Sequence, residues 1–158
     1  MPSKVILVVL DGLSHSVAQH AMGHLHAWCD AGRAAFYRLD CELPALSRPL
    51  YEAILTGVRP IDSGIVHNDV SRLSRERSMF HYARDAGLST AAAAYHWVSE
   101  LYNRSPFVAV RDRHTCDESL PIQHGHSITP TTTRTRTCSS TPRACVCSTR
   151  QTCCWCTR

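Results

Sequence analysis

The sequence predicts an α/β protein, and three features of its amino-terminal part carry that prediction. Residues 5–10 form an unbroken apolar run, the pattern of a strand buried on both faces of a parallel sheet. Residues 17–29 place apolar side chains three and four positions apart, as an amphipathic helix does. Residues 89–94 then form a second, small-residue strand. This alternation is typical of a layered domain with a mainly parallel sheet flanked by helices.

Local signals define the next elements. Gly32 is expected to end the first helix, and a short strand is expected near residues 34–39. Two prolines bracket Ser47. Because proline is tolerated only in the first turn of a helix, we expect a helix to begin just after Ser47 and to close at residues 56–57.

Farther along the chain the pattern weakens. Residues 74–86 are expected to form a helix that stops at Gly87, whereas residues 111–118 are expected to be irregular, loop-rich chain. The 158 residues suit a single domain. No apolar run approaches the roughly 18 residues that a membrane-spanning helix needs, so no membrane span is expected.

The composition changes abruptly at residue 127. Residues 127–158 contain ten Thr, five Arg, six of the nine Cys and no Asp or Glu, whereas residues 1–126 hold 12 Lys and Arg against 13 Asp and Glu. The excess positive charge thus lies in a tail with a single aromatic residue, and we expect no nucleic-acid partner. The few cysteines of the body and the lack of a signal peptide predict a reducing, cytoplasmic setting. The sequence therefore divides into a body, residues 1–126, and a tail, residues 127–158.

Asp11 is the first candidate site residue. It follows directly on the first predicted strand, so its carboxylate should emerge at the carboxyl end of that strand, where open α/β sheets bind their ligands. A carboxylate at that position can bind a divalent cation. An aspartate there can equally well cap the following turn or helix.

Ser47 and Asn68 are further candidates. A hydroxyl at a helix N-terminus lies at the positive end of the helix dipole, which suits a phosphate or a developing alkoxide, although serine is also an ordinary cap. Asn68 could donate its amide to an anionic oxygen or serve in a turn beside Asp69. His20 and His24, four residues apart, could form a zinc pair. They lack the Glu of an H-E-x-x-H arrangement, so a solvated polar face is favoured.

Four ordered motifs resemble the opening of the alkaline phosphatase superfamily, in its nucleotide pyrophosphatase/phosphodiesterase branch. They are KVILVVLDG (residues 4–12), PALSRP (44–49), LTGVRP (55–60) and SGIVHN (63–68). The resemblance implies that Asp11 is a metal ligand, that Ser47 is both nucleophile and metal ligand, and that Asn68 contacts the phosphate. The branch commonly has Thr where this chain has Ser47, a change that keeps the hydroxyl. It often has His in place of Ser63, which leaves the substrate subfamily open.

The resemblance also implies a mechanism. The Ser47 oxygen would attack phosphorus in line, giving a phospho-enzyme intermediate that water hydrolyses, while two divalent metal ions about 4 Å apart stabilise the attacking and leaving oxygens. Zinc is the expected metal and manganese the other candidate, and the substrate is a small phosphoester. The family supplies most metal ligands from Asp-x-x-Gly-His and Asp-His-Gly segments, which are absent from these 158 residues. With the carboxyl-terminal half of the domain missing, the chain is expected to be inactive as written.

The tail is compatible with a shifted reading frame. Reading residues 153–156 one frame off gives Leu-Leu-Val, part of a string that resembles a strand of the same family. The hypothesis is therefore a truncated phosphoester hydrolase joined to a frameshifted, disordered tail. The alternative takes the tail at face value, as a basic, Cys-rich segment that binds zinc or nucleic acid in a non-catalytic binding protein. A body that serves only as an interaction domain is also open, since fold alone does not exclude it.

Overall fold

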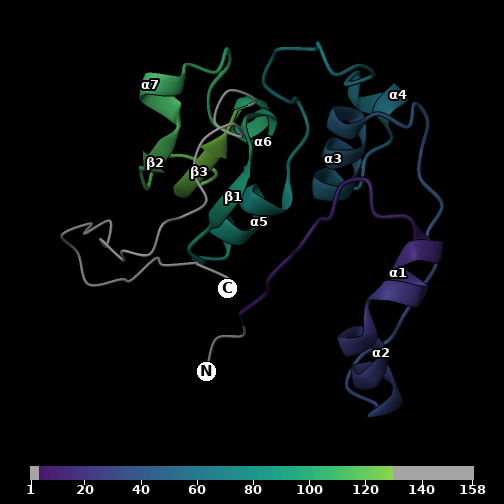
Figure 1. The fold of residues 1–158 in the computed structure, drawn as a ribbon. Coiled ribbons are helices and arrows are strands. Elements are labelled where there is room, and N and C mark those ends of the chain that lie inside the picture. Colours follow the sequence, from purple (N-terminus) through teal and green to yellow (C-terminus); the bar gives the residue numbers. More distant parts are fainter. Residues whose placement is uncertain (1–3, 130–158) are drawn as a thin grey trace. The chain divides into compact units, whose positions relative to one another are not determined.

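The computed structural model describes residues 4–129 and divides the chain into two compact units, residues 1–41 and 42–158 (Figure 1). The described residues form a mixed α/β structure with a small three-stranded sheet and several helices, so the predicted α/β class is confirmed at this level. The predicted tail lies almost wholly outside the described residues, and its boundary at residue 127 stays a prediction.

The first unit contains two short helices, α1 (His15–Ala21) and α2 (Gly23–Asp30). The single helix predicted over residues 17–29 is interrupted at Met22, whose φ of −97° and ψ of 60° leave the helical path. Gly32 follows α2 with a φ of 68°, as its predicted role at the helix end requires.

Neither predicted strand of the first unit forms. Residues 5–10 and 34–39 have no strand structure, and Val5 and Leu39 are 83% and 88% exposed. A strand exists only when a neighbour satisfies its backbone hydrogen bonds, and the three strands of the described part pair with one another. The prediction of a buried strand at residues 5–10 is therefore wrong, because an apolar run indicates a tendency to be buried and does not supply the partner.

In the part of the second unit that the structure describes, residues 42–129, there are five helices and the sheet. Its helices are α3 (Ser47–Thr56), α4 (Pro60–Ser63), α5 (Met79–Asp85), α6 (His96–Tyr102) and α7 (Ala109–Asp112). The predictions of α3 and α5 are confirmed, although α5 begins five residues later than the predicted start at residue 74. Gly57 ends α3 in the left-handed region with a φ of 77°, which glycine adopts without the strain that a Cβ would cause.

The sheet consists of β1 (Ala91–Tyr95), β2 (His114–Cys116) and β3 (His124–Ile128), in the order β1-β3-β2. β1 pairs with β3 in parallel, whereas β2 pairs with β3 in antiparallel orientation, so the described sheet is mixed. β1 is the predicted small-residue strand. The prediction of irregular chain over residues 111–118 is wrong, because β2 gains its order from β3 rather than from an apolar pattern of its own.

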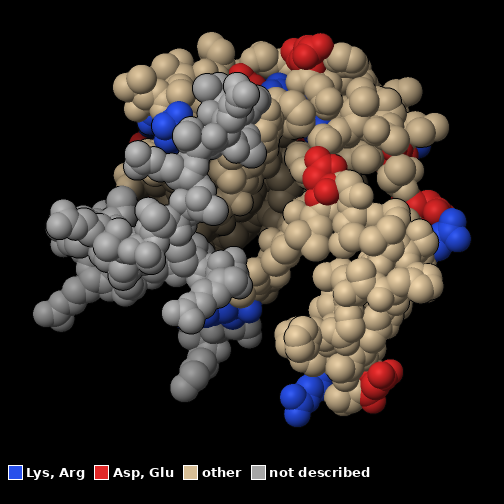
Figure 2. Space-filling model, viewed as in Figure 1, with Lys and Arg blue, Asp and Glu red and all other residues tan. Residues whose placement is uncertain are grey.

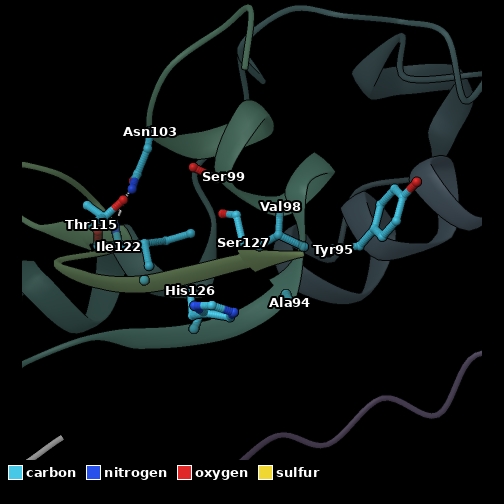
Figure 3. A pocket seen from close by; sticks show the side chains of 11 residues that line it. Ala94, Tyr95, Val98, Ser99, Asn103, Thr115, Ile122, His126 and Ser127 are labelled. Atoms are coloured by element: carbon cyan, nitrogen blue, oxygen red, sulfur yellow. Dashed lines mark hydrogen bonds between the residues drawn. The ribbon is translucent and has the colours of Figure 1, made fainter. Parts of the chain in front are cut away.

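The core of the second unit lies between α3, α6 and the sheet. Its buried apolar side chains are Leu55, Ile65, Val98, Leu101, Tyr102 and Ile122. β1 runs directly into α6, which packs back on β1 and β3. A cavity of only about 10 Å³ remains beside Val98, Ile122 and Ser127 (Figure 3). That space is at the lower limit for one water molecule, so this part of the core has no room for a ligand.

The surface carries charges of both signs. On the face seen in Figure 2, acidic and basic side chains of the described residues are interspersed among uncharged ones. Within residues 4–129, none of the helices has the length and apolarity to cross a membrane.

Candidate functional site

The candidate site is centred on the N-terminus of α3. Leu46 is extended, with φ of −117° and ψ of 149°, and the helix begins at Ser47, one residue earlier than predicted. Pro49 occupies the first turn, where its missing N–H costs no helical hydrogen bond. Ser47 is thus the first residue of a ten-residue helix and lies at the positive end of the helix dipole. Its side chain is partly buried.

Asn68 is brought to the same helix end. Its Oδ1 accepts a hydrogen bond of 3.0 Å from the backbone N–H of Arg48, twenty residues earlier in the chain. Because Arg48 follows Ser47 directly, the amide of Asn68 lies beside the first turn that carries the Ser47 hydroxyl. With Oδ1 bound to the helix, the NH2 group is the part of this amide that can donate to an anionic oxygen.

The Arg48 side chain turns inward and fixes this arrangement. Its guanidinium is nearly fully buried and donates to the carbonyl oxygen of Val70, in the loop that carries Asn68. It also pairs with Glu100 of α6, with 2.5 Å between Nη2 and Oε2, and lies 5.2 Å from the centre of the Trp97 ring. One buried cation therefore ties the start of α3 to the Asn68 loop and to α6.

Glu100 receives two further hydrogen bonds in the core. Ser71 Oγ and the backbone N–H of Phe107 donate to its Oε1 at 2.7 and 3.0 Å. Burial raises the pKa of Glu100, but these hydrogen bonds and the pair with Arg48 outweigh it, so the pKa is lower than usual. The carboxylate is therefore ionised at neutral pH and neutralises the Arg48 charge.

A second buried carboxylate holds the next turn of α3. Glu52 is fully buried and accepts hydrogen bonds from the Tyr102 hydroxyl and from Ser74 Oγ. Burial, together with the neighbouring Glu52, raises the pKa of Tyr102 far above its ordinary value, so the phenol stays protonated and keeps donating. None of Arg48, Glu52 and Glu100 was predicted as a site residue from the sequence. Arg48 and Glu52 are four residues apart on one helix, a spacing that indicates a solvated face.

Asp11 belongs to the first unit and is exposed, whereas Ser47 and Asn68 belong to the second. The prediction that Asp11 and Ser47 share an ion therefore stays a prediction. Across residues 4–129, no three His, Cys, Asp or Glu side chains gather into a group that could hold a metal ion. The described residues thus do not by themselves form a two-metal centre, because each metal ion needs three or more protein ligands gathered around it.

His20 and His24, considered in the sequence as a zinc pair, lie on separate helices. The break at Met22 places them in α1 and α2, so they are not neighbours on one helical face. The His20 Nδ1 instead lies 2.6 Å from the carbonyl oxygen of Ser16.

Comparison with known proteins identifies one family. The sequence model of the family described as type I phosphodiesterase / nucleotide pyrophosphatase matches residues 5–144, most of the chain. No curated protein and no solved structure gives a significant match. The matched stretch contains all three predicted site residues, Asp11, Ser47 and Asn68.

Proposed function

The chain belongs to the type I phosphodiesterase / nucleotide pyrophosphatase family, and on that premise we propose that the N-terminus of α3 carries the nucleophile of a phosphoester hydrolase. The family acts on small phosphoesters and is generally metal-dependent. The hydrogen bond between Asn68 and the Arg48 N–H is the observation that supports the proposal, because it sets the Asn68 amide, which we propose binds phosphate, beside a helix-end hydroxyl. The mixed α/β structure of the described residues is consistent with a partial alkaline-phosphatase-like domain.

The proposed reaction uses the Ser47 hydroxyl as nucleophile. The hydroxyl gives up its proton to water as its oxygen forms a bond to phosphorus. The opposite P–O bond breaks, and the leaving oxygen departs with the bonding electrons and takes a proton from water. Water then cleaves the phosphoserine and restores the hydroxyl. Because the Arg48 N–H holds Oδ1 of Asn68, we assign phosphate-oxygen stabilisation at this helix end to the Asn68 NH2 group, aided by the helix dipole.

Asp11 and Ser47 are the two metal ligands that we propose this chain contributes to a complete active site with two divalent ions, zinc or manganese. Among the described residues, 4–129, no three His, Cys, Asp or Glu side chains form a group that could hold a metal ion. We propose that these 158 residues do not by themselves complete the metal centre and are inactive or nearly so. We also propose a cytoplasmic setting, on the basis of the cysteine usage of the body.

The tail is proposed to be a frameshifted segment of the same hydrolase. Both this proposal and its zinc- or nucleic-acid-binding alternative concern residues outside the described range. Independent resequencing across codons 120–160 tests the frame, and an uninterrupted frame in every read would eliminate the proposal. Tight stoichiometric zinc in a peptide of residues 127–158 would favour the alternative.

Hydrolysis assays on the frame-corrected chain test the proposed chemistry. We expect turnover of a chromogenic phosphodiester or monoester with Mn²⁺ or Zn²⁺, and a loss of at least about a thousandfold in kcat for Ser47→Ala. Ser14→Ala is the matched control, because the Ser14 hydroxyl caps α1 through the Val17 N–H at 3.3 Å, contacts Ser16 Oγ at 3.2 Å and has no role in the proposed reaction. Full activity in Ser47→Ala would contradict the assignment of the nucleophile.

Asn68→Asp separates the two roles of that side chain. Aspartate keeps an acceptor for the Arg48 N–H and suits the helix dipole, so stability should be unchanged. It offers no NH2 donor, so kcat/KM should fall by about a hundredfold or more. A variant with unchanged kcat/KM would show that Asn68 acts only as a cap.

A further inference from the structure

The β2–β3 ladder carries three histidines and one cysteine on one face. Its register sets His114 opposite His126 and Cys116 opposite His124. Because directly opposed residues share a face and alternate residues of a strand point to the same side, the four side chains project together. Figure 3 shows His126 on the opposite side of β3 from its neighbour Ser127, which faces the core. None of the four is used in the proposed hydrolase chemistry.

His114 and His126 already have the spacing of two ligands on one metal ion. Their Nδ1 atoms lie 3.2 Å apart, and their ring centres are 4.7 Å apart. Two nitrogens bound tetrahedrally to zinc at about 2.0–2.1 Å are roughly 3.3 Å from each other. Both residues are exposed, so an ion can reach the pair from solvent.

The chemistry of the facing nitrogens also fits a cation. When two neutral imidazoles face each other through Nδ1, one of them must carry the proton of the hydrogen bond. If that proton moves to Nε2 of the same ring, two lone pairs face each other, and a divalent cation can take the place of the proton. Imidazole nitrogen is a preferred ligand of zinc, nickel and copper.

We propose that His114 and His126 chelate one divalent transition-metal ion through their two Nδ1 atoms. In the described part of the chain no third His, Cys, Asp or Glu completes a group with this pair, so water supplies the remaining positions, as in an open zinc site. The neighbouring pair is the weaker candidate, although Cys116 Sγ and His124 Nδ1 lie 3.7 Å apart. The Cys116 thiol has to lose a proton before it binds a metal, whereas the histidine pair only moves one.

A zinc titration of the full 158-residue chain tests this site ring by ring. With ¹⁵N-labelled histidine, the Nδ1 signals of His114 and His126 should shift together along one binding curve. The six cysteines of the tail also offer thiols to zinc, so the curve is followed at these two rings rather than from total uptake. Shifts confined to other rings, or shifts at Nε2 alone, would overturn the proposal.

Single substitutions provide the second test. In His114→Gln the apparent zinc affinity of the His126 ring should fall at least about tenfold, and His126→Gln should have the same effect on His114. Both positions are exposed, so thermal unfolding of these variants should match that of the unmodified chain. Cys116→Ser and His67→Gln are the matched controls and should leave the curve unchanged. Retained affinity in either glutamine variant, or loss in Cys116→Ser, would overturn the assignment.

Discussion

Replacing Glu100 by glutamine should strongly destabilise the second unit, because three donors converge on this carboxylate. Oε2 lies 2.5 Å from Nη2 of Arg48, while Oε1 accepts from Ser71 Oγ and the Phe107 N–H. Glutamine keeps one acceptor oxygen and places an NH2 donor at the other position. Either Arg48 or the Ser71 and Phe107 donors would then face a donor instead of an acceptor.

The expected loss in the free energy of unfolding is about 3–5 kcal/mol, the cost of leaving one charge of a buried ion pair without its partner. The Arg48 and Glu100 side chains are only 3% and 6% exposed, so water cannot replace the missing carboxylate. An exposed pair provides the contrast. The Arg59–Asp62 contact of 2.8 Å joins side chains that are 62% and 50% exposed, and Asp62→Asn should leave stability unchanged.

Denaturant unfolding followed by circular dichroism measures the free energy of unfolding of these variants. A double variant keeps the test informative if Glu100→Gln does not fold. Arg48→Met combined with Glu100→Gln removes both charges, while the glutamine oxygen still accepts from Ser71 and Phe107, and should recover most of the stability that Glu100→Gln alone loses. A loss below about 1 kcal/mol for Glu100→Gln would refute the buried pair, since removing the partner of a buried charge lowers the free energy of unfolding by more than that. A double variant less stable than Glu100→Gln would refute it as well.

Other substitutions test the contribution of the Asp112 charge to stability and the backbone conformation at two glycines. Hydrogen bonds from Arg111 lower the pKa of the buried Asp112 in the folded chain, so this group stabilises the fold above the unfolded pKa of about 3.9. That contribution is lost as pH falls through the folded pKa, and Asp112→Asn should flatten the decline in denaturant midpoint between pH 5 and 3. Gly64→Ala should cost about 1–3 kcal/mol, because φ is 72° and the new Cβ would lie 3.0 Å from Arg72 Nη2. Gly23→Ala, with no heavy atom within 4 Å of the new Cβ, should leave the midpoint unchanged or raise stability by up to about 1 kcal/mol. Equal losses in the two alanine variants would contradict the backbone argument.

The sequence predicted the helices whose ends are set by nearby residues such as proline and glycine. Proline in the first turn and glycine at the end delimit α3, and Gly87 follows α5 with a φ of 71°. Strands depend on partners, which single-sequence patterns do not contain. Residues 5–10 have the stronger strand pattern and form none, whereas β2 and β3 are rich in His, Gly, Ser and Thr and pair with each other.

The candidate site was predicted through motifs rather than geometry. Order and spacing pointed to Ser47 and Asn68, but the bond that brings Asn68 to the Arg48 N–H spans twenty residues and follows from no periodicity. The buried charges could not be predicted from the sequence for a related reason. Glu100 is fifty-two positions from Arg48, so the sequence gives no sign that either side chain has a partner that permits burial.

The apolar run at residues 5–10 has a consequence for handling the protein. Six consecutive aliphatic side chains, with Val5 and Val8 83% and 70% exposed, have the composition of segments that stack into amyloid-like fibrils. Lys4 and Asp11 flank the run as its nearest charges. At high expression the chain should accumulate in inclusion bodies that bind thioflavin, and Val8→Lys should shift it to the soluble fraction.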